Sequence, residues 1–136
     1  MPIRRTLCLL AAMLGAGCSD STSPRAALDG SWSHFDPAFR YGMTLTTNES
    51  TLTGAGQWSG EACCVGTVVA HGTVDDEFVD FELDFVATQG GLQLPAPFSQ
   101  HFTGRRIGSD SLDGVLTATG QPIPFGYHRT RSPAID

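Results

Sequence analysis

From Leu28 onward, turn-forming residues recur roughly every ten positions and divide the chain into short runs rich in Thr, Val and Phe. Clusters of Gly, Asn, Asp and Pro between such runs are typical of all-β proteins. The runs lie near residues 31–35, 41–47, 51–58, 66–74, 78–87, 98–107, 111–119 and 123–129. The 16 glycines among 136 residues also disfavour a helical bundle, because Gly is a poor helix former. The sequence therefore predicts eight β-strands in one domain.

The run at 78–87 has the clearest pattern, because its apolar and acidic side chains alternate strictly. One face carries Val79, Phe81, Leu83 and Phe85, and the other carries Asp80, Glu82 and Asp84. A strand alternates in this way when one face of its sheet is packed and the other is solvated. The three acids lie too far apart along one strand to wrap a single calcium ion. We therefore interpret them as a solvated face, and we expect Arg105 and Arg106 on the next strand to pair with them.

The connections between the predicted strands are short, which favours antiparallel neighbours over crossover connections. Closing eight such strands into a barrel removes the exposed sheet edges and leaves room for side chains or one small ligand. We predict an all-β fold, an eight-stranded antiparallel up-and-down β-barrel over residues 28–130, with a β-sandwich as the alternative. Large rings are expected to fill the lumen, namely those of Trp32, Trp58, Phe81, Phe85, Phe102 and Phe125.

Residues 1–17 have the pattern of an export signal. Arg4 and Arg5 precede an apolar run that ends at Leu14 and is too short to span a bilayer, and small residues then lead to Cys18. This segment resembles a bacterial lipoprotein signal peptide, whose cleavage motif ends in a cysteine. The resemblance implies cleavage before Cys18, which would carry a thioether-linked diacylglycerol and an amide-linked acyl chain. Several acyl chains anchor a protein stably to a membrane.

The resemblance also implies a location. Ser19, and not an aspartate, follows the cysteine, and in such lipoproteins this sorts the protein to the outer membrane, on its periplasmic side. Residues 18–27 are small and polar and predict a flexible tether, and residues 131–136 predict a disordered tail. With 8 Lys+Arg against 14 Asp+Glu, the acidic chain is a poor candidate for nucleic-acid binding.

Two segments resemble known small barrels. Leu28-Asp29-Gly30-Ser31-Trp32 resembles the Gly-x-Trp opening of lipocalins and of related eight-stranded barrels such as the avidins. Leu52-Thr53-Gly54-Ala55-Gly56 resembles a Leu-Thr-Gly strand common in these proteins. The resemblance covers residues 28–130 in outline. It implies that Trp32 plugs one end of the barrel and packs on an arginine of the last strand, for which Arg129 is the candidate.

Cys63 and Cys64 are adjacent, which is unusual in a chain expected in an oxidising compartment. Three interpretations remain open at this point. The pair forms a vicinal disulfide, or it stays as two free thiols, or it holds a soft metal together with His71 or Glu61. The spacing matches no zinc motif, because adjacent cysteines lack the gap that lets two thiolates chelate one ion.

Residues 87–97 form the longest predicted connection and contain two apolar residues without a strand partner, Leu92 and Leu94. They either cover the mouth of a ligand-binding barrel or cap the protein's own core. No catalytic motif is present in the sequence, and its four histidines are scattered. We therefore predict a non-enzymatic protein without a cofactor or metal, with a binding or structural role. The alternatives are a carrier of a small apolar ligand and a protein-binding or protease-inhibitor module.

Overall fold

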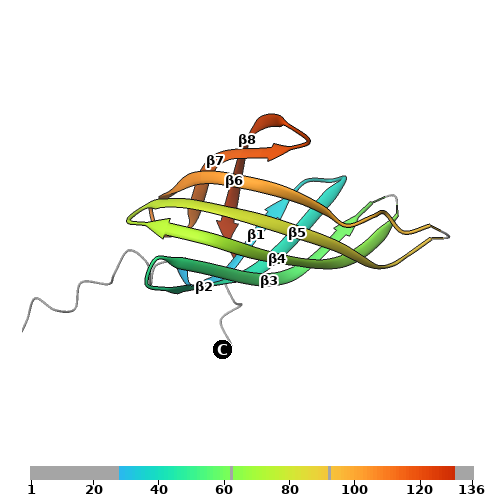
Figure 1. Ribbon diagram of the computed structural model, residues 1–136, viewed down its shortest axis with the longest axis horizontal. Coiled ribbons are helices and arrows are strands. Elements are labelled where there is room, and N and C mark those ends of the chain that lie inside the picture. The colour runs from blue at the N-terminus through green and yellow to red at the C-terminus, as the bar shows by residue number, and fades with distance from the viewer. Residues whose placement is uncertain (1–27, 62, 92, 131–136) are drawn as a thin grey trace, which may run out of the picture.

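The computed structural model describes residues 28–61, 63–91 and 93–130 (Figure 1). Its strands are β1 (Gly30–Phe35), β2 (Phe39–Asn48), β3 (Thr51–Gly60), β4 (Cys64–Asp75), β5 (Phe78–Gly90), β6 (Phe98–Ile107), β7 (Ser111–Ala118) and β8 (Gln121–Arg129). Each strand pairs antiparallel with the next, and β8 pairs with β1 to close the barrel. The predicted eight-stranded barrel is confirmed, and the sandwich alternative is wrong. The signal peptide, the tether with Cys18, the C-terminal tail and Leu92 lie outside the described residues.

The alternation predicted for the fifth strand is present in β5. Its four apolar side chains are buried, and the acids between them face away from the core. The strand is longer than predicted, because its pairing with β4 continues past a register shift between Val65 and Gly66 and ends with Gly90 opposite Cys64. The predicted connection 87–97 is therefore wrong at its start. Residues 87–90 belong to β5, and only 91–97 link it to β6.

Because the strands run up and down, their connections gather at two ends of the barrel (Figure 1). We call the end where Leu28 leads into β1 the entry end. It also holds the turns between β2 and β3, β4 and β5, and β6 and β7. The opposite end, here called the far end, holds the connections at 36–38, 61–63, 91–97 and 119–120.

The seam that closes the barrel is short. In the described chain the β-ladder between β1 and β8 has only two residue pairs, Trp32 with Arg129 and Ser33 with His128, both at the entry end of β8. Further along β8, Pro122 and Pro124 have no β1 partner among the described residues. Proline has no N–H to offer to another strand, so these residues protect the open edge from pairing with a second chain.

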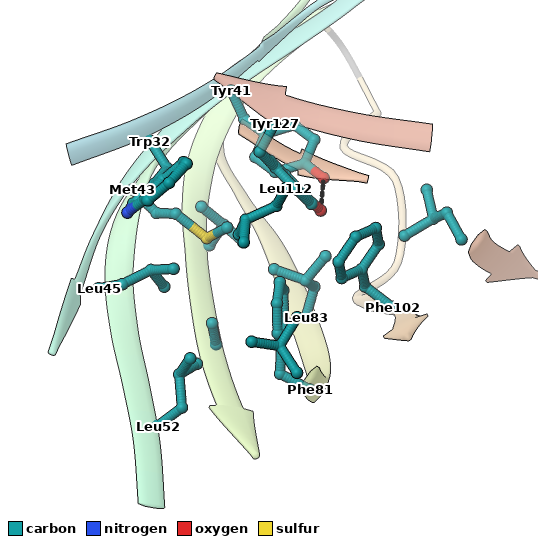
Figure 2. Close-up of a cluster of buried hydrophobic side chains, with 14 of the residues drawn as sticks. Trp32, Tyr41, Met43, Leu45, Leu52, Phe81, Leu83, Phe102, Leu112 and Tyr127 are labelled. Carbon is teal, nitrogen blue, oxygen red and sulfur yellow. Dashed lines mark hydrogen bonds between the residues drawn. The ribbon is translucent and has the colours of Figure 1, made fainter. Parts of the chain in front are cut away.

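The lumen is filled by the protein's own side chains (Figure 2). Rings from β5, β6 and β8 pack at a tilt or edge to face, with centroids 5.1 Å apart for Phe81 and Phe102 and 5.0 Å apart for Phe102 and Tyr127. One continuous cluster contains the buried residues Leu28, Trp32, Tyr41, Met43, Leu45, Leu52, Trp58, Cys64, Val68, Ala70, Val74, Val79, Phe81, Leu83, Phe85, Phe102, Leu112, Leu116 and Tyr127. Five of the six predicted rings belong to it, and Phe125 is partly buried against it.

Glycines let the neighbouring strands β6 and β7 come close to one another. Gly104 of β6 and Gly114 of β7 lie directly opposite each other. A Cβ atom on Gly104 would lie 2.4 Å from the carbonyl oxygen of Asp113 and 2.8 Å from the ring of Phe102. Larger residues there would force the two strands apart, so these glycines set the curvature of this wall.

Candidate functional site

The entry end is closed by Trp32, whose side chain is completely buried. Its indole Nε1 donates a hydrogen bond to the carbonyl oxygen of Leu28 at 2.8 Å. The guanidinium carbon of Arg129 lies 4.5 Å from the centroid of the indole, a distance at which a cation–π interaction is favourable. The structure thus brings together the two residues that the lipocalin resemblance singled out as a plug.

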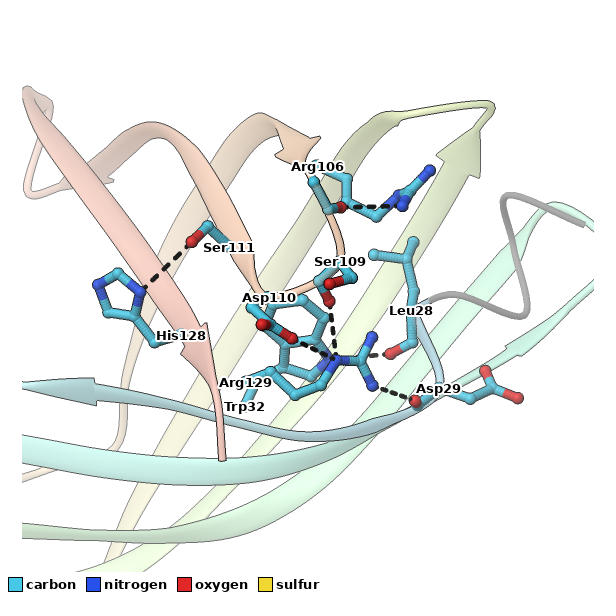
Figure 3. Close-up of polar contacts among 10 residues, drawn as sticks. Leu28, Asp29, Trp32, Arg106, Ser109, Asp110, Ser111, His128 and Arg129 are labelled. Atoms are coloured by element: carbon cyan, nitrogen blue, oxygen red, sulfur yellow. Dashed lines mark hydrogen bonds and ion pairs between the residues drawn. The ribbon is translucent and has the colours of Figure 1, made fainter. Parts of the chain in front are cut away.

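Arg129 also ties three chain segments together at this end (Figure 3). Its Nη1 donates to the carbonyl oxygen of Asp29 at 2.7 Å, and its Nε donates to the carbonyl oxygen of Ser109 at 2.9 Å. Gly30 makes room for this guanidinium, because a Cβ atom there would lie 2.6 Å from Nη1, and its φ of +133° also disfavours any other residue. In the Gly-x-Trp segment, the glycine therefore leaves space for Arg129 and the tryptophan packs against it.

A buried pair of hydroxyl groups joins β2 and β8, the two strands that flank β1. The hydroxyl groups of Tyr41 on β2 and Tyr127 on β8 lie 2.5 Å apart (Figure 2). Burial raises the pKa of both phenols well above the ordinary value of 10.0. Sequence reasoning missed this pair, because the contact needs strands that are distant in the chain. One hydroxyl donates to the other inside the core, so the pair is a structural feature of the barrel.

A groove of about 590 Å³ lies near the far end and runs across β1 to β5. Most of its lining side chains lie on the strand face opposite to the buried Tyr41 and Trp58, so the groove is on the outside of the barrel. Phe35 is the most prominent of them, being 71% exposed, and the guanidinium of Arg40 lies 5.3 Å from its ring centroid. Val65 adds a further exposed apolar side chain. Sequence reasoning missed this groove.

The cysteines lie beside the groove, at the start of β4. Cys63 and Cys64 are joined by a disulfide bond, Cys63 is exposed and Cys64 is buried. Leu94 lies against Gly90, the β5 partner of Cys64, because a Cβ atom on Gly90 would lie 2.9 Å from its Cδ2. Leu94 therefore packs over the end of the β4–β5 pair. His71 lies further along β4, opposite Glu82, so it does not join the cysteines.

The acidic face of β5 differs from the prediction. Arg105 lies opposite Phe78 and Asp113, and the Arg106 Nη1 donates to the carbonyl oxygen of Gly108. The expected pairing of these arginines with the acids is therefore wrong. It fails because the register of β6 places a histidine, and not an arginine, opposite the centre of the acidic row.

Comparison with known proteins gives no relative: no family model, no curated protein and no solved structure matches this chain significantly. Within the part of the chain that the structure describes, no helix has the length and apolar character needed to cross a membrane.

Proposed function

We propose that this chain is a lipid-anchored, non-enzymatic binding protein on the periplasmic side of the outer membrane, and that it binds a partner protein in the far-end groove. The observation that carries this proposal is the contrast between the two spaces of the barrel. The lumen is filled by a continuous cluster of buried side chains, whereas the groove on the outer surface is open and holds exposed aromatic and apolar groups.

The path of the chain supports the orientation that this function needs. The described chain begins at Leu28, at the entry end, and a lipid on Cys18 would hold this end toward the membrane. The strands then carry the groove away from the membrane, because Phe35, Arg40 and Val65 lie near the opposite ends of their strands. A partner in the periplasm would meet the groove without obstruction from the bilayer.

The packed lumen weighs against the alternative of an apolar-ligand carrier. A carrier needs a concave space that encloses most of its ligand. Here Phe85 and Phe98 stack with centroids 4.8 Å apart at the far end of the lumen, and Phe39 packs on Trp58 at 5.3 Å beside them. These rings occupy the entrance through which a ligand would have to pass.

The chemistry of the groove favours a protein over a small molecule. Aromatic residues and arginine are enriched where proteins meet, and Phe35 with Arg40 forms such a pair in the open. The polar side chains of Gln57 and Thr88 lie around it and offer hydrogen-bonding groups. A groove with an exposed aromatic anchor and a polar surround fits the surface of a partner protein.

Site-specific photo-crosslinking in the cells that export the protein tests this proposal. A photoreactive residue in place of Gln57 should give a discrete crosslinked protein, whereas the same residue in place of Thr53 should not. Thr53 is the matched control, because it lies exposed on the same strand and face but does not line the groove. Phe35→Ser should abolish the adduct. Equal adducts from both positions, or none from Gln57, would show that the groove is not the binding surface.

A further inference from the structure

Two histidines and three carboxylates lie together on the outer face of β4, β5 and β6. Glu82 on β5 is directly opposite His71 on β4 and directly opposite His101 on β6. Asp80 and Asp84 lie two residues to either side of Glu82 on the same face of β5. A row of imidazole, carboxylate and imidazole therefore crosses three strands, with an acid on each side.

The distances within this cluster are close to those of a metal site. His71 Nδ1 lies 3.5 Å from Asp84 Oδ2, and His101 Nε2 lies 2.9 Å from Asp80 Oδ1. His71, Glu82 and Asp84 each offer one ligand atom within 4.8 Å of the other two. Ligand atoms around a tetrahedral zinc ion are about 3.4 Å apart. The side chains of His71 and Asp84 are 55% and 44% exposed, so rotamer changes can close the remaining gap.

The charge around the row also favours a cation. The row is flanked by uncharged residues on β3 and β7, since His71 lies opposite Thr53 and His101 lies opposite Thr117. In the described chain no arginine lies opposite any residue of the row. Three carboxylates on one sheet face repel one another, and a divalent ion between them would offset that repulsion.

We propose that His71, Glu82 and Asp84 bind one divalent transition-metal ion of the zinc type. Mixed imidazole and carboxylate donors suit Zn²⁺ and Cu²⁺, whereas Ca²⁺ and Mg²⁺ prefer oxygen donors alone. Three protein ligands leave a fourth position for water or for a donor group of another molecule. This site is separate from the far-end groove, so it does not depend on the proposed function.

Calorimetric titration of the mature chain with zinc chloride tests the site, using protein prepared without a polyhistidine tag and freed of metal. We expect one ion to bind per chain. His71→Ala and Glu82→Gln should each weaken binding by about 10-fold or more. His128→Ala is the matched control, because His128 is an exposed strand histidine whose Nδ1 lies 3.5 Å from Ser111 Oγ and which is not paired with an acid in the described chain. This variant should bind zinc as the unchanged chain does.

Four results would overturn the proposal. They are the absence of saturable binding, unchanged binding in His71→Ala and Glu82→Gln, equal affinity for calcium chloride, and loss of binding in Cys63→Ser/Cys64→Ser. The last two would assign the ion to the carboxylates alone or to the thiols. Each variant should melt at the same temperature as the unchanged chain in the absence of metal, which excludes misfolding as the cause of weaker binding.

Discussion

Trp32→Ala should strongly lower the free energy of unfolding of the barrel. The indole is fully buried, donates a hydrogen bond to Leu28 and lies under the guanidinium of Arg129. Replacing a buried Trp or Phe by Ala costs about 3–5 kcal/mol. Trp32→Phe keeps a buried ring but removes the hydrogen bond from the indole to the Leu28 carbonyl, a loss of about 1 kcal/mol. It also weakens the cation–π contact by about 0.5–1 kcal/mol. The expected loss for Trp32→Phe is therefore about 1.5–2 kcal/mol.

Equilibrium unfolding in urea measures both losses. The chain has 2 tryptophans, so Trp58 remains as the fluorescent reporter in each Trp32 variant. Phe35→Ala is the control, because Phe35 is 71% exposed, and substitutions at such surface sites usually change stability by less than about 0.5 kcal/mol. A loss below about 1 kcal/mol in the free energy of unfolding for Trp32→Ala would show that Trp32 does not close the barrel as described, because removing a buried tryptophan costs more than this.

Three further predictions concern the anchor, the cysteines and the tyrosines. Cys18→Ala should release the protein from the membrane fraction and leave a heavier, uncleaved precursor, whereas unchanged membrane association would contradict lipidation. Thiol labelling of the purified processed chain, in which the Cys18 sulfur would carry the lipid, should be negligible before reduction and should reach two groups after it, since Cys63 and Cys64 are bonded to each other. Full labelling without reductant would contradict the disulfide. Because burial raises the pKa of both tyrosines present in the chain, the folded state keeps protons that the unfolded state releases near pH 10.0. The free energy of unfolding should therefore be unaffected at neutral pH and should fall as the pH rises past this value. Tyrosinate absorbance should appear only when the protein unfolds. Absorbance that rises near pH 10.0 in the folded protein would contradict the buried pair.

The barrel could be predicted because each strand has a pattern that a short stretch of sequence reveals. The strict alternation around Phe81 and the turn-forming residues between the strands each follow from the chemistry of a few neighbouring residues. The ends of strands were less predictable. The last residues of β5 have weak strand preference, and they extend because Cys64 and Val65 of β4 lie opposite them. Tertiary pairing thus decides what local propensity leaves open.

The candidate sites needed the register of strands that are distant in sequence. The pairing of Glu82 with both His71 and His101 depends on two separate strand alignments, and a shift of one residue in either would turn a histidine to the other face. The outer groove depends on the coiling of five strands, which no single segment encodes. The bond between Tyr41 and Tyr127 joins residues whose contact exists only after closure.

Native mass spectrometry of the protein extracted from its membrane in mild detergent tests most directly whether the lumen is solid. We expect the mass of the processed chain with its covalent lipid, and at most bound metal, but no other retained small molecule. A non-covalent apolar ligand of defined mass that stays bound, and that is lost when Trp58 or Phe85 is replaced by alanine, would show a hollow carrier and contradict the account.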